Sequence, residues 1–119
     1  MTIQILSQSA TLSTLDDHGT VGRPLSQPPC RTRGIDIVLA GAGNNGCGIW
    51  ECNPGRFERQ IPEAEVMHIL SGECSFTPQD GPALEIRAGD TLFFPANTIG
   101  VWHIRQTLRK VYAVFASQA

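Results

Sequence analysis

The feature that most constrains the fold is a series of short apolar runs, separated by turn-forming residues, that begins at Gly34. Each run is rich in β-branched or aromatic residues, and clusters of Gly, Pro, Asn and Asp lie between the runs. Such spacing is typical of an antiparallel sandwich or barrel. No window long enough for a helix keeps a helical period of apolar residues. The sequence therefore predicts an all-β single domain, with strands at residues 35–39, 48–52, 56–61, 65–70, 73–77, 83–87, 91–94, 99–104 and 109–115.

The N-terminal segment, residues 1–33, is polar and rich in turn residues, among them Pro24, Pro28 and Pro29. We expect a short edge strand at residues 2–6, followed by a loop that lies over the barrel. Residues 34–119 are expected to form the barrel itself. A chain of 119 residues has room for one domain of ordinary size and little more.

Composition narrows the possible partners. The chain is 41% hydrophobic and 17% charged, so it can bury a core, which a disordered chain cannot. A formal net charge of −2 and the absence of any Lys/Arg run argue against nucleic-acid and membrane-surface partners. The first residues are neither basic nor continuously apolar, so we expect no signal peptide and a cytoplasmic location. There the sparse cysteines should be reduced thiols: Cys30, Cys47, Cys52 and Cys74. We expect Cys47, Cys52 and Cys74 to be small buried core residues.

Two segments resemble the two short motifs of the cupin superfamily. The first runs from Gly55 to Gly72, and its ending, Glu65 followed by VMHILS and Gly72, matches the end of the first motif. The second, AGDTLFFPAN, matches the second motif except that Asn97 replaces a glycine. Asparagine tolerates the left-handed backbone region better than most residues, so the replacement is mild.

More narrowly, the segments GIWECNPGRF, EVMHILSGECSFTP, AGDTLFFPAN, VWHI and LRKVY resemble a subgroup of small single-domain cupins. These are the relatives of (S)-ureidoglycine aminohydrolase and of ethanolamine-utilisation protein Q. The resemblance covers residues 46–115 and implies a cupin-type antiparallel β-barrel, a jelly roll of the RmlC-like kind. It implies little about activity, because this barrel hosts unrelated chemistries and also proteins that are not enzymes.

The resemblance also locates a metal site, from which this sequence departs. Metal-binding cupins hold a divalent transition metal with three histidines and a glutamate. The positions of those histidines fall at Arg59, Ile61 and Gly100, so only Glu65 remains of the four. We therefore expect no metal cofactor of the usual kind, and the same departure argues against the aminohydrolase activity.

A divalent transition metal held by other side chains is the alternative. The possible ligands on the relevant segments are Glu63, Glu65, His68 and His103. If Glu65 points into the barrel, strand alternation turns His68 outward, and His103 is out of phase with Gly100. Surface or interface histidines are the simpler interpretation.

A polar centre without a metal is the favoured hypothesis. Alternation places Arg59, Ile61, Glu63 and Glu65 on one face of the chain. Desolvation drives a carboxylate that is buried alone toward its neutral form, and a neighbouring guanidinium keeps it ionised. We therefore expect an Arg59–Glu65 pair, with Lys110 nearby, to take the place of the metal.

In this hypothesis the ligand is a small polar molecule and Glu65 is the candidate general base. The candidate substrate-binding side chains are Arg59, Glu63, Trp102, Lys110 and Trp50. Three classes of function stay open: a metal-independent enzyme or binder, a metalloenzyme such as a ureidoglycine-aminohydrolase-like hydrolase, and a noncatalytic module that binds a partner. Because a second copy often covers the exposed strand edges of such barrels, we expect a homodimer.

Overall fold

The computed structural model describes residues 2–117, and these residues form eight β-strands and no helix. Within this range there is accordingly no helix of the length and apolarity needed to cross a membrane. The all-β prediction is confirmed, and four of the predicted strands coincide closely with β3, β4, β6 and β7. In chain order the strands are β1 (Asp16–Thr20), β2 (Arg31–Ile37), β3 (Gly46–Cys52), β4 (Gly55–Ile61), β5 (Glu65–Pro78), β6 (Leu84–Arg87), β7 (Thr91–Phe94) and β8 (Thr98–Val114).

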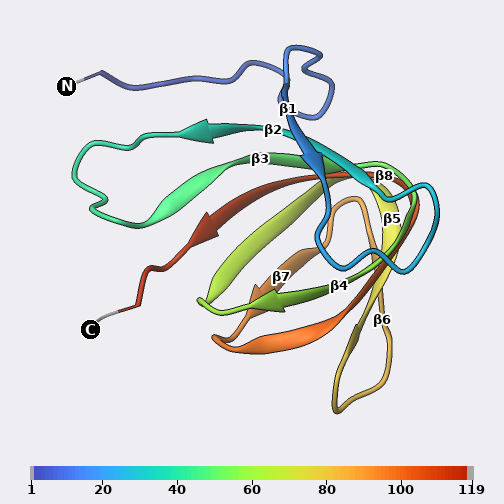
Figure 1. Ribbon diagram of the computed structural model, residues 1–119. Coiled ribbons are helices and arrows are strands. Elements are labelled where there is room, and N and C mark those ends of the chain that lie inside the picture. The colour runs from blue at the N-terminus through green and yellow to red at the C-terminus, as the bar shows by residue number, and fades with distance from the viewer. Residues whose placement is uncertain (1, 118–119) are drawn as a thin grey trace.

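Two long antiparallel strands hold the barrel together. β5 pairs with β7 through its first part and with β6 through its second part. β8 pairs first with β4 and then with β3, and it also pairs with β5 along most of its length. Each long strand therefore belongs to both sides of a jelly roll. Figure 1 shows β5 and β8 curving through the fold, with β2 and β3 above them and the orange first half of β8 at the bottom of the view, below β4 and β7.

The prediction that residues 65–70 and 73–77 form separate strands was wrong, as was the matching division of β8. Ser71-Gly72 has the chemistry of a turn, but the ladder between β5 and β8 instead shifts register between Ile69 and Cys74. Gly72 has a φ of 91° at this bulge, and its Cα lies so close to the Thr107 carbonyl that no side chain would fit. A bulge bends a strand without ending it, and glycine supplies the required backbone conformation.

The expected edge strand at residues 2–6 was also wrong. The edge strand of this segment is β1, which pairs antiparallel with β2. Its sequence, DDHGT, has no alternation of apolar residues. Main-chain hydrogen bonds to β2 and the 2.8 Å ion pair between Arg31 and Asp17 hold it at the edge of the sheet. Ile3 and Ile5, which suggested a strand, are 95% and 82% exposed. Figure 1 shows this part of the chain extending over β2, away from the barrel.

The core lies between the two sides of the barrel. At its centre the rings of Phe76, Phe94 and Trp102 pack with centroids 4.8 to 5.8 Å apart. Burying each large apolar side chain stabilises the fold by roughly 1.5–3 kcal/mol. The other buried members are Val21, Cys30, Cys52, Phe57, Ile61, Met67, Ile69, Cys74, Ile86, Ile104 and Leu108.

The four cysteines are free thiols. Cys52 and Cys74 are fully buried as expected, and Cys30 is fully buried too. Cys47 is only half-buried, because it lies opposite Ile37 beside the loop that connects β2 and β3. Burial raises the pKa of the Cys74 thiol to about 12 and also raises the pKa of the Cys52 thiol. The thiolate is the nucleophilic form, so neither group is reactive near neutral pH.

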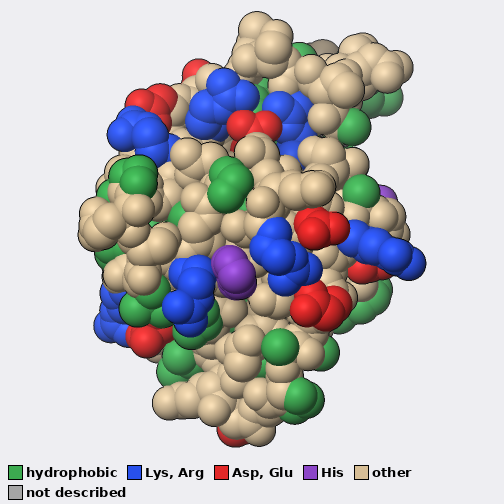
Figure 2. Space-filling view, turned by 90° about the vertical axis from the view of Figure 1, so that its right-hand side faces the viewer, with side chains coloured by type: hydrophobic (Ala, Val, Ile, Leu, Met, Phe, Trp, Pro, Cys, Tyr) green, Lys and Arg blue, Asp and Glu red, His purple; other side chains and the backbone are tan. Residues whose placement is uncertain are grey.

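The outer surface mixes charges of both signs. On the face drawn in Figure 2, basic and acidic side chains lie beside one another, with tan polar and backbone atoms between them. Neither sign forms a continuous patch on that face.

Candidate functional site

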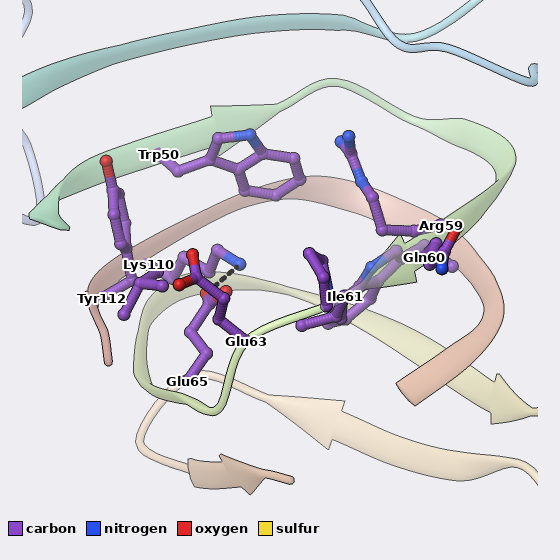
Figure 3. Close-up of a pocket in the computed structure, with 11 residues that line it drawn as sticks. Trp50, Arg59, Gln60, Ile61, Glu63, Glu65, Lys110 and Tyr112 are labelled. Carbon is purple, nitrogen blue, oxygen red and sulfur yellow. Dashed lines mark hydrogen bonds and ion pairs between the residues drawn. The ribbon is translucent and has the colours of Figure 1, made fainter. Parts of the chain in front are cut away.

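A cavity of about 260 Å³ opens at one end of the barrel, between β3, β4, the start of β5 and the second half of β8. The general-base candidate and all five substrate-binding candidates of the sequence lie in its wall. The complete lining is Trp50, Arg59, Gln60, Ile61, Pro62, Glu63, Glu65, Trp102, Lys110, Tyr112 and Val114. Figure 3 shows how these side chains converge from four segments that lie far apart in the sequence.

Strand alternation accounts for part of this convergence. Arg59 and Ile61 are two residues apart on β4, so they face the same way. Glu63 lies in the short β4–β5 connection and Glu65 begins β5, and both reach the cavity despite the intervening Pro62.

The charged centre of the cavity is an ion pair between Lys110 and Glu65. Lys110 Nζ lies 3.1 Å from Glu65 Oε2, and the two side chains are only 9% and 13% exposed. The predicted Arg59–Glu65 pair was wrong in its partner: within residues 2–117, Glu65 forms its ion pair with Lys110 and none with Arg59. The reason is the topology, because the second half of β8, which carries Lys110, pairs with the first part of β5. Arg59 on β4 instead lies opposite Gly100, in the first half of β8.

Aromatic rings surround the Lys110 ammonium. Its Nζ lies 4.7 Å from the Trp50 ring centroid, 5.6 Å from that of Trp102 and 6.0 Å from that of Tyr112. Met67 Sδ lies 3.5 Å from the same nitrogen. The faces of aromatic rings attract a cation, which stabilises a desolvated ammonium by about 2 kcal/mol. The rings thus offset part of the free-energy cost of removing the Lys110 ammonium from water, while they keep bulk water away from it.

Burial and neighbouring charges act on Lys110 in opposite directions. Loss of hydration lowers the pKa of the Lys110 ammonium, the Glu65 carboxylate raises it, and the positive charge of Arg59 lowers it again. The balance leaves the pKa of Lys110 below the ordinary value for lysine, because desolvation is the largest effect. Loss of a proton from this nitrogen is therefore easier than from an exposed lysine.

Arg59 is the second cation of the cavity wall, and the negative charge of Glu65 acts on it only from a distance. Its guanidinium carbon lies 5.1 Å from the Phe57 ring centroid. No carboxylate in residues 2–117 lies within ion-pair distance of it. Burial lowers the pKa of Arg59, but arginine stays protonated in proteins. In Figure 3 Arg59 rises from β4 at one end of the cavity, the Lys110–Glu65 pair lies at the other, and Trp50 lies between them.

Two further polar side chains of the wall are held by partners at its edge. Glu63 Oε2 accepts a hydrogen bond of 2.8 Å from the Ser117 amide. The Tyr112 hydroxyl donates a hydrogen bond of 3.0 Å to Asp36 Oδ1. Tyr112 lies two residues after Lys110 on β8, so both side chains are on the same face of the strand.

The residues present do not fit the metal site that the resemblance implies. The β4–β8 register puts Gly100 opposite Arg59. A Cβ on Gly100 would lie 2.5 Å from Phe76 Cζ, so the Phe76 ring fills the space that a histidine at this position would need. Of the four expected ligand positions only Glu65 can bind a cation, and its Oε2 is engaged by an ammonium group.

The alternative metal ligands do not come together. His68 Nδ1 lies 2.7 Å from Thr91 Oγ1 and His103 is exposed, and neither lines the cavity with Glu65 and Glu63. Within residues 2–117, no three side chains of the His, Cys, Asp and Glu types gather as a metal site would require.

The central position of Lys110 was not foreseen, although the sequence carried a signal for it. Lys110 is the only lysine of the chain, and the eight other basic residues are arginines. Its predicted strand is apolar on both sides, with LRKVYAVF around it. A lone lysine in an apolar strand indicates a buried ammonium that needs a partner.

Comparison with known proteins agrees with the fold. The sequence model of the EutQ-like cupin domain family matches residues 39–112. A putative ethanolamine utilization protein Q from Salmonella typhimurium LT2 is 18% identical over 74% of this chain and 72% of that one, with a TM-score of 0.64. The EutQ protein of Clostridium difficile is 17% identical over 81% of this chain and 78% of that one, with a TM-score of 0.66.

A third structure is a protein of unknown function of the DUF861 family from Pseudomonas syringae pv. tomato. It is 24% identical over 87% of this chain, with a TM-score of 0.76, and this chain covers 45% of its length. No curated protein sequence matches this chain. At these identities the likeness shows a shared fold.

Proposed function

We propose that this chain, which belongs to the EutQ-like cupin domain family, binds a small carboxylate-bearing molecule inside its barrel. The observation that carries the proposal is the Arg59 guanidinium, which lines the cavity and forms no ion pair among residues 2–117. The Lys110–Glu65 pair is internally neutral, and Glu63 is engaged by the Ser117 amide. Glu63 keeps its negative charge, but its Oε2 accepts the hydrogen bond of the Ser117 amide, so Arg59 is the cation of the wall that is open to a ligand. Its planar guanidinium can bind both oxygens of a carboxylate.

The size of the cavity favours a short ligand. Its volume of about 260 Å³ lies below the roughly 300–1,000 Å³ of sites that hold drug-sized molecules. Trp50, Ile61 and Val114 supply apolar wall between the charged ends. A molecule with one anionic group and a short carbon skeleton satisfies both the charge and the volume.

Glu65 is the proposed proton acceptor for any reaction of the bound molecule. Its Oε2 lies 3.1 Å from Lys110 Nζ, which is within reach for transfer of a proton between the two groups. The pair can thus accept a proton at one atom and donate one from the other without a net change of charge.

Calorimetric titration of the full chain with lactate, and with neutral lactamide as the control ligand, tests the proposal. Loss of a hydrogen-bonded charge typically costs about 1.5–3 kcal/mol, so Arg59→Met should weaken lactate binding by roughly tenfold or more. Arg56→Met is the matched control, because Arg56 lies on the same strand but is exposed. Equal binding of lactate by the Arg59→Met variant, equal binding of lactamide, or no binding of lactate by the wild type would contradict the proposal.

Hydrolysis of the ureidoglycine aminohydrolase kind is less well supported by these residues. Only the resemblance to the ureidoglycine aminohydrolase subgroup implies that activity. Three of the four expected ligand positions hold Arg59, Ile61 and Gly100. A noncatalytic module is compatible with the fold, but a cavity that holds an unpaired cation favours a ligand inside the barrel.

A homodimer in the cytoplasm is the proposed assembly. Ile3, Ile5 and Val38 are 95%, 82% and 87% exposed, and a 2.8 Å hydrogen bond from Gln4 Nε2 to the Val38 carbonyl brings them to one region. Neighbouring exposed apolar side chains are typical of interfaces. In sedimentation experiments the wild type should be a dimer and a variant with Ile3 and Ile5 changed to serine a monomer; a monomeric wild type would contradict this.

A further inference from the structure

The lysine in the cavity has no structural reason to be a lysine rather than an arginine. Arginine is preferred in buried ion pairs because it is always charged and forms two parallel hydrogen bonds. The chain uses it for this purpose in the nearby pair of Arg109 with Glu51, at 2.7 Å and with side chains 7% and 14% exposed. Lys110 is adjacent in sequence and equally buried, yet it is the only lysine of the chain. What a lysine offers and an arginine does not is an amine that can lose its proton and attack a carbon atom.

We infer that Lys110 forms a reversible imine with the carbonyl carbon of a small 2-oxo acid whose carboxylate is bound by Arg59. This inference rests on the proposed function and names its substrate class: a carboxylate with a ketone or aldehyde carbonyl next to it. Arg59 and the Lys110–Glu65 pair lie at opposite ends of one cavity, with the Trp50 indole between them (Figure 3). The arrangement presents an anion-binding group and an amine to one short molecule that carries a carboxylate and a carbonyl.

The surroundings of Lys110 are those that activate an amine. The rings of Trp50, Trp102 and Tyr112 and the sulfur of Met67 exclude water from its nitrogen. An apolar pocket and a second cation in the same cavity both favour the neutral amine, as in other proteins that use a lysine as nucleophile. These effects also lower the pKa of Lys110, and burial is the largest of them. The lone pair that attacks a carbonyl is available only on the neutral amine.

Glu65 is placed to carry the protons of the reaction. Lys110 gives one proton to the Glu65 carboxylate, at 3.1 Å, and the resulting amine attacks the carbonyl carbon, forming the C–N bond. The carbonyl π electrons pass to the oxygen, which takes that proton from Glu65, and the attacking nitrogen then returns a second proton to Glu65. The resulting carbinolamine loses its hydroxyl group as water, with this second proton from Glu65, as the nitrogen lone pair forms the C=N bond. The net change is an ammonium and a carbonyl converted to a protonated imine and water, with no oxidant or reductant consumed.

Reductive trapping tests the inference directly. The full chain is incubated with pyruvate and sodium cyanoborohydride, which reduces an imine to a stable amine, and is then analysed by intact mass and peptide mapping. The chain has only two amines, at Lys110 and at the N-terminus. We expect one reduced pyruvate adduct, borohydride-dependent and located on the peptide that contains Lys110. An adduct on the N-terminal peptide alone, or none, would overturn the inference.

Variants separate this inference from the proposed function. Lys110→Arg keeps the charge but removes the amine, so it should abolish the adduct. Glu65→Gln should slow adduct formation by roughly 100-fold or more, because it removes the proton carrier. Should either variant fail to fold, the peptide map of the wild type decides alone. Arg59-dependent binding of lactate without an adduct overturns the imine and leaves the proposed function; absence of any binding and any adduct overturns both.

Discussion

Replacing Glu65 by glutamine leaves the Lys110 ammonium buried without its counter-charge. The pair is 3.1 Å apart, with side chains 9% and 13% exposed, so water cannot replace the lost carboxylate. Removing one partner of a buried ion pair costs about 3–5 kcal/mol, out of roughly 5–15 kcal/mol for a whole domain. In urea, with a slope of about 1–3 kcal/mol per molar, the unfolding midpoint of Glu65→Gln should fall by roughly 2 M.

A double-mutant cycle isolates the interaction between the two groups. Lys110→Met alone should also destabilise, because it leaves the Glu65 carboxylate unpaired beside apolar rings. E65Q/K110M removes both charges, so its loss in the free energy of unfolding should be smaller than the sum of the single losses by about 2 kcal/mol. Urea denaturation followed by tryptophan fluorescence measures all four proteins, with an unchanged slope as the condition for comparing them.

The control for this cycle is an exposed pair of similar chemistry. Arg23 and Glu58 lie 2.7 Å apart but are 67% and 41% exposed, so Glu58→Gln should cause a much smaller loss. Additivity of the Glu65 and Lys110 variants to within about 0.5 kcal/mol would refute the reasoning, because it would mean that the two charges do not sense each other.

Two further predictions concern the core around the cavity. Gly100→Ala should lower the free energy of unfolding, measured in urea, by about 1–3 kcal/mol, because the new Cβ would lie 2.5 Å from Phe76 Cζ. Gly46→Ala is the control and should be nearly neutral, because nothing lies within 4 Å of its added Cβ. Equal losses in the two variants would contradict this prediction. The buried Cys74 thiol keeps its proton up to a pKa of about 12, whereas the unfolded chain loses it from 9.0. Between these two pKa values the unfolded state therefore binds fewer protons than the folded state, so the free energy of unfolding falls as the pH rises. The fall should be steeper in the wild type than in Cys74→Ala, by up to about 1.4 kcal/mol per pH unit. Identical pH profiles of stability would show that the thiol does not contribute.

Local sequence was sufficient to predict where most strands lie. Apolar alternation and turn residues marked β3, β4, β6 and β7, and the AGDTLFFPAN motif even anticipated the left-handed Asn97, whose φ is 62°. The errors arose where one residue pattern serves two structures. Ser71-Gly72 is suitable for a turn or for a bulge, and only the long β8 strand opposite it decides for the bulge. The polar strand β1 has no alternation of apolar residues, and it is a strand because it pairs with the free edge of β2.

The candidate site shows the same limit at the level of single side chains. Period-two alternation applied from Arg59 to Glu65 correctly directed both side chains toward one cavity, although they lie on β4 and β5 and a short connection separates these strands. Choosing the partner of Glu65 required knowing which strand lies next to β5, and that is a property of the topology. β8 begins some 30 residues after Glu65 in the sequence, yet it delivers Lys110 to the carboxylate. Cross-strand partners therefore escape prediction until the register is known.

Stability alone does not account for an ion pair in this place. Replacing a buried pair by apolar residues of similar volume is often neutral or stabilising, and the neighbours of Lys110 are already aromatic rings and Met67. If the ion pair had only a structural role, removing both charges would not lower the free energy of unfolding. The E65Q/K110M variant therefore distinguishes two explanations. If the double variant is as stable as the wild type but no longer traps pyruvate, the ion pair is retained for the chemistry of the cavity. If the double variant also binds lactate as the wild type does, Arg59 holds the ligand independently. The ion pair then acts only in the step that follows binding.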